Sequence, residues 1–257
     1  MFACAFSITA LAALASATTS PHNSSCPEHL YKTYVFSTDP LVIYIPNFIT
    51  PEESEHVQAI SAGKFTSSQI ADSSGQQHLA STRKSQSTSL ESDDVVRCIE
   101  QRALEFQGFD TKRESLEPLQ LVKYGESQEY HSHTDWFTSP AQTTAEYGGN
   151  RQSSFFVYIH ASDDIVGGGT QFPLLDAPKD ERWCAYVNCD AELKDGVVFR
   201  PVQGNAVFWR NMKDGGKGLV GDRRTVHAGL PVQRGSKIGM NVWTREGELD
   251  EKFRVAA

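Results

Sequence analysis

Two histidines and an aspartate lie close together in the segment YHSHTDWF (130–137). Side chains of an extended strand alternate between its two faces, so His131, His133 and Asp135 are predicted to project to the same side. Imidazole and carboxylate groups together suit a borderline divalent cation better than calcium. The three residues therefore indicate a metal site, although on their own they also fit the polar edge of a strand.

Two residues far downstream strengthen the metal hypothesis. His227 lies in TVHAGLP, and Lys237 begins the apolar stretch that contains IGMNVW. Two histidines and one carboxylate on one side of a metal form the facial triad of non-haem Fe(II) oxygenases, which leaves positions for a bidentate organic co-substrate and O₂. If the co-substrate carries a second carboxylate, a lysine on a neighbouring strand can hold it by charge-assisted hydrogen bonds.

Two helices are predicted in the first half of the chain. The segment PLVIYIPNFI (40–49) has the composition of a strand, and Thr50 and Pro51 then provide an N-cap and a first helical residue for a helix over 51–62. Ser92-Asp93-Asp94 caps a second helix with an apolar stripe. Between the helices, residues 64–90 are rich in Ser, Gln and Thr without a sustained period, which predicts a long surface loop.

From about residue 118 the sequence changes to short strands separated by turn residues. They are LQLVKY (119–124), SSFFVYIH (153–160), TQFP (170–173), GVVFRP (196–201), NAVFW (205–209) and IGMNVWT (238–244). Helices followed by many strands, without alternation of the two, predict an α+β domain built as an antiparallel sandwich or jelly roll. The glycines at 167–169 lack the strand-to-helix context and the lysine of a phosphate-binding loop.

Composition narrows the class of protein. The chain has 257 residues, 39% of them hydrophobic and 10% aromatic, with 24 basic and 32 acidic side chains and a net charge of −8. This composition is too apolar for a disordered chain. The acidic balance also disfavours a nucleic-acid binder, which would carry a basic face.

The N-terminus indicates entry into the secretory pathway. Residues 1–17 carry no charged side chain and end in Ala-Ser-Ala, as a cleaved signal peptide does, and an uncleaved signal-anchor or a buried helix are the alternatives. Removing this leader would leave four cysteines. Cys184 and Cys189 are placed to close a short loop, and Cys26 is a candidate partner for Cys98. We expect a location in the endoplasmic reticulum or outside the cell, with membrane contact only through a signal-anchor.

Several segments together resemble a known family. PLVIYIPNFIT, QLVKYGESQEYHSHTDWF, YIHASDDIVGGGTQFP, GNAVFW and HAGLPVQRGSKIGMNVW follow one another in the order and spacing of the 2-oxoglutarate/Fe(II)-dependent dioxygenases. Among these the chain is most similar to the prolyl 4-hydroxylase catalytic domain, especially its fungal branch, from about residue 26 to 243. The resemblance implies a double-stranded β-helix (jelly roll). Together with the leader read from residues 1–17 and a polar linker over 18–35, this predicts one oxygenase domain over 36–257, with helical support at 50–110 and a jelly-roll core at 118–245.

The resemblance also assigns roles to individual residues. It makes His133, Asp135 and His227 the Fe(II) ligands, whereas His131 precedes the family's expected pair and competes with His133 as a ligand. Lys237 would bind the distal carboxylate of 2-oxoglutarate. The resemblance places three further residues beside the co-substrate pocket: Tyr124, Thr170 and Trp243. It places Arg151 where it faces substrate. Three aromatic residues are assigned to the core: Trp136, Phe137 and Trp209.

The implied reaction couples oxidative decarboxylation of 2-oxoglutarate by O₂ to hydroxylation of a substrate C–H bond, with ascorbate maintaining the iron. The leading hypothesis is hydroxylation of a prolyl residue in a peptide or protein. One alternative is the same chemistry on a small molecule or secondary metabolite. An alternative of another class is a non-catalytic jelly-roll binding module, against which the presence of all four of His133, Asp135, His227 and Lys237 counts.

Overall fold

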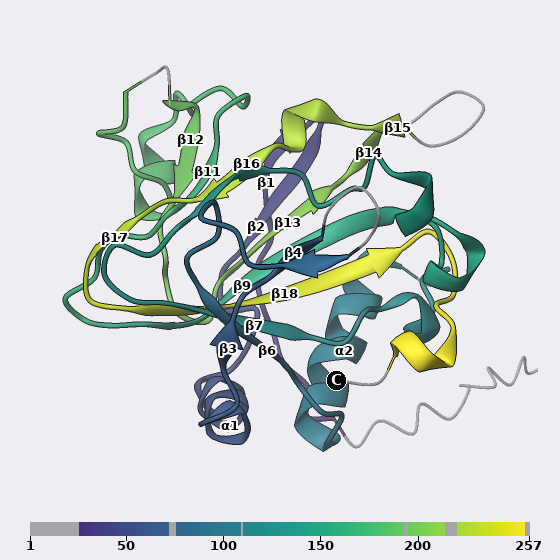
Figure 1. The fold of residues 1–257 in the computed structure, drawn as a ribbon. Helices are drawn as coiled ribbons and strands as arrows, with labels where there is room; N and C mark the ends of the chain where they lie inside the picture. The colour runs from purple at the N-terminus through teal and green to yellow at the C-terminus, as the bar shows by residue number, and fades with distance from the viewer. Residues whose placement is uncertain (1–25, 72–75, 109, 193–194, 214–219, 255–257) are drawn as a thin grey trace, which may run out of the picture.

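The computed structural model describes residues 26–254 except 72–75, 109, 193–194 and 214–219. Two antiparallel sheets dominate it (Figure 1). The large sheet has the order β1 (Tyr34–Thr38), β2 (Leu41–Ile45), β13 (Ala206–Arg210), β9 (Arg151–Ala161), β18 (Lys237–Arg245), β7 (Gln120–Tyr124), β6 (Gln86–Ser89) and β3 (Thr66–Ser67). The small sheet has the order β12 (Val197–Phe199), β11 (Thr170–Phe172), β16 (His227–Gly229) and β8 (Tyr130–His133).

Short elements complete the described chain. Three strand pairs lie outside the two sheets: β4 (Ile70–Ala71) with β5 (Gln77–His78), β10 (Val166–Gly167) with β17 (Val232–Arg234), and β14 (Met212–Lys213) with β15 (Val220–Gly221). The 3₁₀ turns are η1 (Arg113–Ser115), η2 (Pro140–Gln142), η3 (Ala145–Tyr147), η4 (Glu181–Ala185), η6 (Arg223–Thr225) and η7 (Glu251–Phe253).

The central strand β9 shows why the large sheet is buried on both faces. Phe155, Val157 and Ile159 point into a core that the helices cover. Phe156 and Tyr158 point the other way, into a second core shared with the small sheet. A strand buried on both faces reads as a continuous apolar run, which is why SSFFVYIH shows no alternation. The side chains that face the small sheet are the ones that can reach a site between the sheets.

Both predicted helices are present. Helix α1 (Pro51–Ser61) starts with a capping box, in which Thr50 accepts from the backbone of Glu53 and the Glu53 carboxylate accepts from the backbone of Thr50. Helix α2 (Asp94–Gln107) is capped by the side chain of Asp93. Arg102 on α2 binds Glu53 through two hydrogen bonds of 2.7 Å. The helices lie together beneath the large sheet in Figure 1 and close the core on that side.

Two disulfide bonds join the four cysteines of the described chain. Cys26 is bonded to Cys98 and thereby ties the N-terminal segment to α2. Cys184 is bonded to Cys189 across η4 and the segment after it. Both pairings are those suggested by the sequence.

The stretch 64–90 is not the long loop that its polar composition predicted. β3 and β6 extend the large sheet at its edge, and β4 and β5 form a small hairpin. β6 pairs with β7 through four residues from Gln86 to Ser89. Backbone pairing with an existing edge needs little apolar side-chain burial, so a Ser- and Gln-rich segment can still be a strand. β1 also begins at Tyr34, inside the segment expected to be a linker.

The predicted leader, residues 1–17, lies outside the described residues. No helix in the described part of the chain has the length and apolar character needed to cross a bilayer.

Candidate metal and co-substrate site

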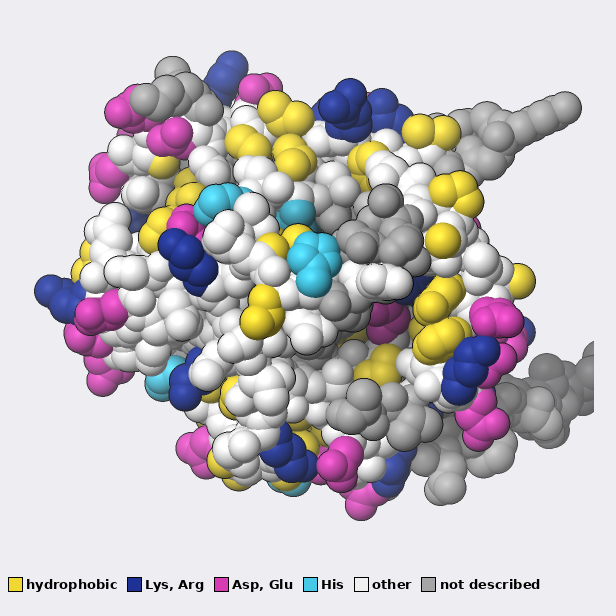
Figure 2. All heavy atoms as spheres, in the orientation of Figure 1, with side chains coloured by type: hydrophobic (Ala, Val, Ile, Leu, Met, Phe, Trp, Pro, Cys, Tyr) yellow, Lys and Arg dark blue, Asp and Glu magenta, His cyan; other side chains and the backbone are white. Residues whose placement is uncertain are grey.

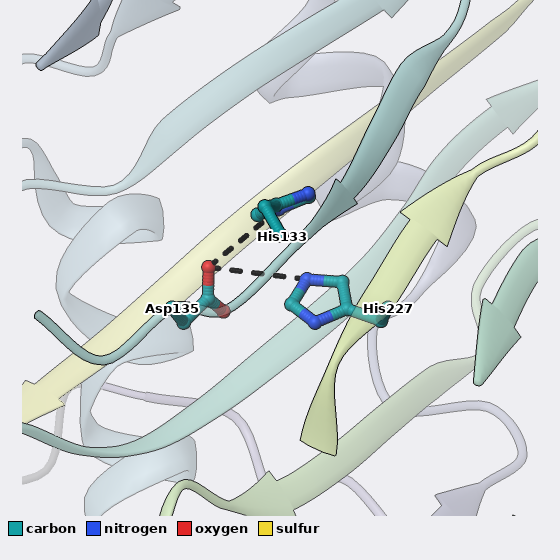
Figure 3. Close-up of side chains that lie close together, drawn as sticks. All are labelled: His133, Asp135 and His227. Atoms are coloured by element: carbon teal, nitrogen blue, oxygen red, sulfur yellow. Dashed lines mark ion pairs between the residues drawn. The ribbon is translucent and has the colours of Figure 1, made fainter. Parts of the chain in front are cut away.

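His133, Asp135 and His227 converge between the two sheets (Figure 3). His133 ends β8 and His227 begins β16, and the two residues are paired across these neighbouring strands. Asp135 follows β8 by two residues. Its Oδ1 lies 3.9 Å from Nε2 of each histidine, and one donor atom from each residue falls within 4.8 Å of the others. This spacing suits three ligands of one metal ion.

Backbone carbonyls orient both imidazole rings. Nδ1 of His133 donates to the carbonyl of His131 at 2.8 Å, and Nδ1 of His227 donates to the carbonyl of Thr225 at 3.0 Å. A carbonyl can only accept, so each Nδ1 carries a hydrogen, and Nε2 is the ring nitrogen left to bind a metal. Burial, reinforced by His227, lowers the pKa of His133 to about 3. His133 is therefore neutral at physiological pH, as a metal ligand must be.

Asp135 is charged although it is buried. Burial alone raises its pKa, but His227, Arg151, His133 and a hydrogen bond from Ser154 outweigh that effect and lower the pKa below its usual value. Ser154 donates to Oδ2 at 2.7 Å. Oδ1, which faces the histidines, is left to bind a cation.

His131 does not join this group. β8 ends at His133, so the strand alternation expected to align His131 with Asp135 does not continue that far. The side chain of His131 is 52% exposed and lies 3.4 Å from Glu129. Among the described residues, the only metal-binding cluster of three such side chains is His133, Asp135 and His227.

Lys237 is a completely buried cation. Its ammonium donates to the carbonyl of Gly168 and lies 4.7 Å from the ring centre of Tyr124 and 5.5 Å from that of Phe156. Within the described chain no carboxylate forms an ion pair with it, and burial lowers its pKa to about 7. A buried cation with only a carbonyl and aromatic rings around it favours an added anion.

A cavity of about 690 Å³ opens beside these groups. The three candidate ligands line it, as do Tyr124 and Phe156, the two rings that contact Lys237. On the face drawn in Figure 2, histidine side chains gather near the middle. A dicarboxylate in this cavity would have metal-binding atoms on one side and, behind the rings of Tyr124 and Phe156, a buried cation.

The other predicted site residues all line the cavity, but in different settings. The Thr170 hydroxyl accepts a 2.9 Å hydrogen bond from Tyr158. Burial raises the pKa of Tyr124 to about 12, so its phenol stays protonated. Trp243 is buried, and its indole N–H has no hydrogen-bond partner. This orphan donor is a further sign that the pocket accepts a polar ligand.

Arg151 is held rigidly in the cavity wall. Its guanidinium forms two 2.7 Å hydrogen bonds with Glu117 and lies 3.5 Å from the ring centre of Trp243. Glu117 also accepts a 2.6 Å hydrogen bond from Arg245. The two arginines outweigh burial and keep the pKa of Glu117 low. The cluster keeps one net positive charge at the wall of the cavity.

Two aromatic residues assigned to the core from sequence instead line the cavity, namely Trp136 and Phe137. They follow Asp135 directly, so the turn that carries the aspartate also carries them into the cavity wall. Trp209 is a core residue as expected, with 1% of its surface exposed.

Sequence reasoning missed three supporting residues: Ser154, Glu117 and Gly168. Ser154 and Glu117 are ordinary polar residues in apolar surroundings, and only their contacts reveal them. The glycine run at 167–169 did stand out. Gly168 has a φ of +67°, which a glycine adopts without strain, and its carbonyl meets Lys237.

The comparisons with known proteins agree with this geometry. Residues 119–245 match the family model of the 2OG-Fe(II) oxygenase superfamily. The chain belongs to this superfamily of oxidoreductases, and its fold is the jelly roll predicted from sequence.

Its relatives include prolyl 4-hydroxylases. Prolyl 4-hydroxylase 1 of Arabidopsis thaliana is 29% identical over 221 residues, covering 84% of this chain and 72% of the relative. Prolyl 4-hydroxylase subunit alpha-2 of Gallus gallus is 31% identical over 210 residues, and the match covers 80% of this chain but 34% of that subunit.

Solved structures show the same fold. The viral collagen prolyl hydroxylase of Paramecium Bursaria Chlorella virus-1, in its 2OG complex, superposes with a TM-score of 0.55 at 22% identity, over 79% of this chain and 94% of that chain. A prolyl hydroxylase from Trichoplax adhaerens, in complex with a hypoxia inducible factor peptide fragment, superposes with a TM-score of 0.52 at 15% identity, over 83% of this chain and 85% of that chain.

Proposed function

We propose that this protein uses Fe(II), 2-oxoglutarate and O₂ to hydroxylate prolyl residues of a peptide or protein. The observation that carries the proposal is the cluster of His133, Asp135 and His227 in one cavity with the aromatic rings that contact the buried Lys237. The prolyl 4-hydroxylases among its relatives support the choice of substrate.

The donor set fits Fe(II). Two imidazoles and one carboxylate on one side of the ion are the ligands of non-haem iron oxygenases, and they leave positions for other groups. Bound iron supplies the oxidative decarboxylation of 2-oxoglutarate and the hydroxylation of a C–H bond, while the protein supplies binding and orientation. His133 and His227 offer Nε2 as the ligand atom, because backbone carbonyls hold their Nδ1 hydrogens.

The co-substrate pocket lies on the large-sheet side of the cavity. Lys237 attracts the distal carboxylate of 2-oxoglutarate, which relieves the unfavourable burial of the ammonium. Tyr124 and Thr170 offer hydroxyl groups at the wall of the same cavity. Trp243 adds an indole N–H and an aromatic surface.

The lining of the cavity away from the iron ligands suits an extended peptide better than a small metabolite. Gln69, Ile70, Thr82 and Arg83 bring the segment between the two helices to the cavity. Arg151, which lines the same cavity, stacks on Trp243 and is held by Glu117, so it presents a fixed cation and an aromatic surface. We assign Arg151 to substrate contact, where it can bind backbone carbonyls of a peptide.

The two disulfide bonds support a place in the secretory pathway, because such bonds persist in oxidising compartments. We propose the endoplasmic reticulum or the extracellular space as the location. Ascorbate is the reductant that we expect to sustain turnover.

The test is a substrate screen. Purified protein with Fe(II), ascorbate and 2-oxoglutarate is offered proline-rich peptides in one arm and small molecules in the other, and mass spectrometry detects the gain of one oxygen atom. We expect hydroxylated peptide and stoichiometric succinate. The His133→Ala variant is the control without a complete metal site. Oxygen incorporation into small molecules alone would assign the chemistry to a different substrate, and succinate without any metal requirement would refute the proposal.

A further inference from the structure

A chain of buried hydrogen bonds leads from Trp209 to the carboxylate of Asp135. Trp209 Nε1 donates to Asn211 Oδ1 at 2.8 Å, Asn211 Nδ2 donates to Ser154 Oγ at 2.9 Å, and Ser154 donates to Asp135 Oδ2 at 2.7 Å. Asn211 and Ser154 have no exposed surface, and Trp209 has 1%. The chain is complete without water, since each donor bonds directly to an acceptor on the next side chain.

The direction of this chain is fixed by chemistry. An indole N–H can only donate, so it selects the oxygen of the Asn211 amide and turns the amide nitrogen toward Ser154. The Ser154 oxygen then accepts from Asn211, which leaves its own hydrogen for Asp135. A carboxylate ends the chain because it can only accept. Every rotatable polar group along the path therefore has one favoured orientation.

The same elements also hold His227. The ring of Trp209 packs edge-on against that of His227, with centroids 4.8 Å apart. The carbonyl of Asn211 accepts from the backbone of Asp222, and the carbonyl of Asp222 accepts from Thr225. Thr225 is the residue whose carbonyl orients His227. Asn211 thus connects through its side chain to Asp135 and through its backbone to the segment before His227.

We propose that Ser154, set in place by Asn211 and Trp209, is a positioning residue that keeps Oδ2 of Asp135 occupied so that Oδ1 alone is offered to the metal. This inference rests on the proposed function, since it requires a metal at His133, Asp135 and His227. A carboxylate bound through one oxygen leaves room on the metal for a bidentate co-substrate and O₂. Hydrogen-bond partners of metal ligands commonly affect metal affinity by 10–100-fold.

The experiment measures binding of Co(II) to the apoprotein by calorimetry, so that no turnover is needed. Ser154→Ala removes the hydroxyl, and we expect the Kd for Co(II) to rise about 10-fold or more. Ser154→Thr keeps a hydroxyl and should restore affinity to within about 3-fold of the wild type. The matched control is Ser153→Ala, because the neighbouring Ser153 faces α2 and donates to Gln107 instead. Its Kd should equal that of the wild type, even if its thermal midpoint falls.

Each outcome decides the matter. Equal Kd values for Ser154→Ala and Ser153→Ala would overturn the positioning role while leaving the metal site intact. A wild-type protein that binds Co(II) no better than His133→Ala would instead overturn the metal site itself, and the inference with it. Should Ser154→Ala fail to fold, Trp209→Phe removes the indole N–H that donates to Asn211 and keeps an aromatic ring beside His227. Wild-type affinity in that variant would count against the proposal, and weaker binding would support it.

Discussion

Replacing Lys237 with methionine should stabilise the protein and destroy its affinity for 2-oxoglutarate. Methionine has nearly the length of lysine but carries no charge, so the change removes the ammonium and retains most of the packing. Lys237 has no exposed surface and no anionic partner in the described chain. The two effects have opposite sign because the same cation is costly in the apoprotein and necessary in the complex.

The size of the stability effect follows from the pKa. A fall in the Lys237 pKa from 10.5 to about 7 corresponds to about 5 kcal/mol against the ammonium form. Methionine leaves the carbonyl of Gly168 without its donor, which costs about 1–3 kcal/mol. The net gain should therefore be about 2–4 kcal/mol near neutral pH.

The gain has a defined pH window. Between pH 7 and 10.5 the unfolded chain keeps the lysine proton that the folded chain has lost, so wild-type stability rises with pH across this range. The advantage of Lys237→Met is therefore full below pH 7 and fades toward pH 10.5. Chemical denaturation of the apoprotein at several pH values measures it.

The binding effect should be as large or slightly larger, and it is unfavourable. Removing one partner of a buried ion pair costs about 3–5 kcal/mol, which is roughly 100- to several thousand-fold in the Kd for 2-oxoglutarate. Calorimetry on the Co(II)-loaded protein measures it. In the wild type, affinity should also fall as pH rises above about 7, because the free lysine then loses the proton that binding requires.

A matched control separates this reasoning from a general effect of losing a lysine. Lys123 lies on the adjacent strand β7 with an exposed side chain, and Lys123→Met should change neither stability nor binding appreciably. A loss of stability in Lys237→Met would show that the buried ammonium is not a net cost. Unchanged affinity for 2-oxoglutarate would remove Lys237 from the co-substrate site.

Three further changes test other parts of the site and fold. His227→Ala should abolish succinate production from 2-oxoglutarate, and continued production would remove His227 from the ligands. Arg151→Gln breaks the paired contact with Glu117 and the stack on Trp243, so the KM for peptide should rise at least 10-fold while the Kd for 2-oxoglutarate stays the same; a shift in the latter alone would contradict a substrate role. Replacing Cys26 and Cys98 by alanine should cost about 4 kcal/mol of unfolding free energy and replacing Cys184 and Cys189 about 2, since the bridges span 72 and 5 residues; equal costs in denaturant titrations would refute this loop-length argument.

The strands of the core could be predicted because burial selects their residues. β9, β13 and β18 are buried along most of their length and carry apolar runs there, and the sequence located each of them to within two residues. The N-caps of the two helices, Thr50 and Asp93, could be predicted equally well, since capping uses a small set of side chains at fixed positions.

The edge of the large sheet could not be predicted in the same way. β3 and β6 consist of Thr, Ser and Gln, and their place is set by backbone hydrogen bonds to β7 and to each other. Amino-acid composition carries no signal for this backbone pairing. The end of β8 was missed for a related reason, because the turn after His133 is held by a residue far along the chain. The side chain of Asn150 accepts from the backbone N–H of Phe137 and donates to its carbonyl.

The site residues also fall into those that the sequence reveals and those that only their contacts reveal. His133, Asp135, His227 and Lys237 were found because few other residue types can perform their chemistry. Ser154 and Asn211 act through position alone, and serine and asparagine are common wherever a strand begins, ends or meets a turn. Sequence therefore identified the groups that could touch a ligand more readily than the groups that hold them.

The site is made of groups that are costly to the protein by itself. Lys237 is a buried cation without an anion, and Trp243 has a buried indole N–H without an acceptor. His133 and His227 hold Nε2 3.9 Å from Oδ1 of the buried Asp135. Each of these costs is removed by the same kind of ligand set, a divalent metal with a dicarboxylate beside it. A fold that only needed a stable core would replace these groups with apolar ones, so their presence together between the two sheets favours ligand binding as their role.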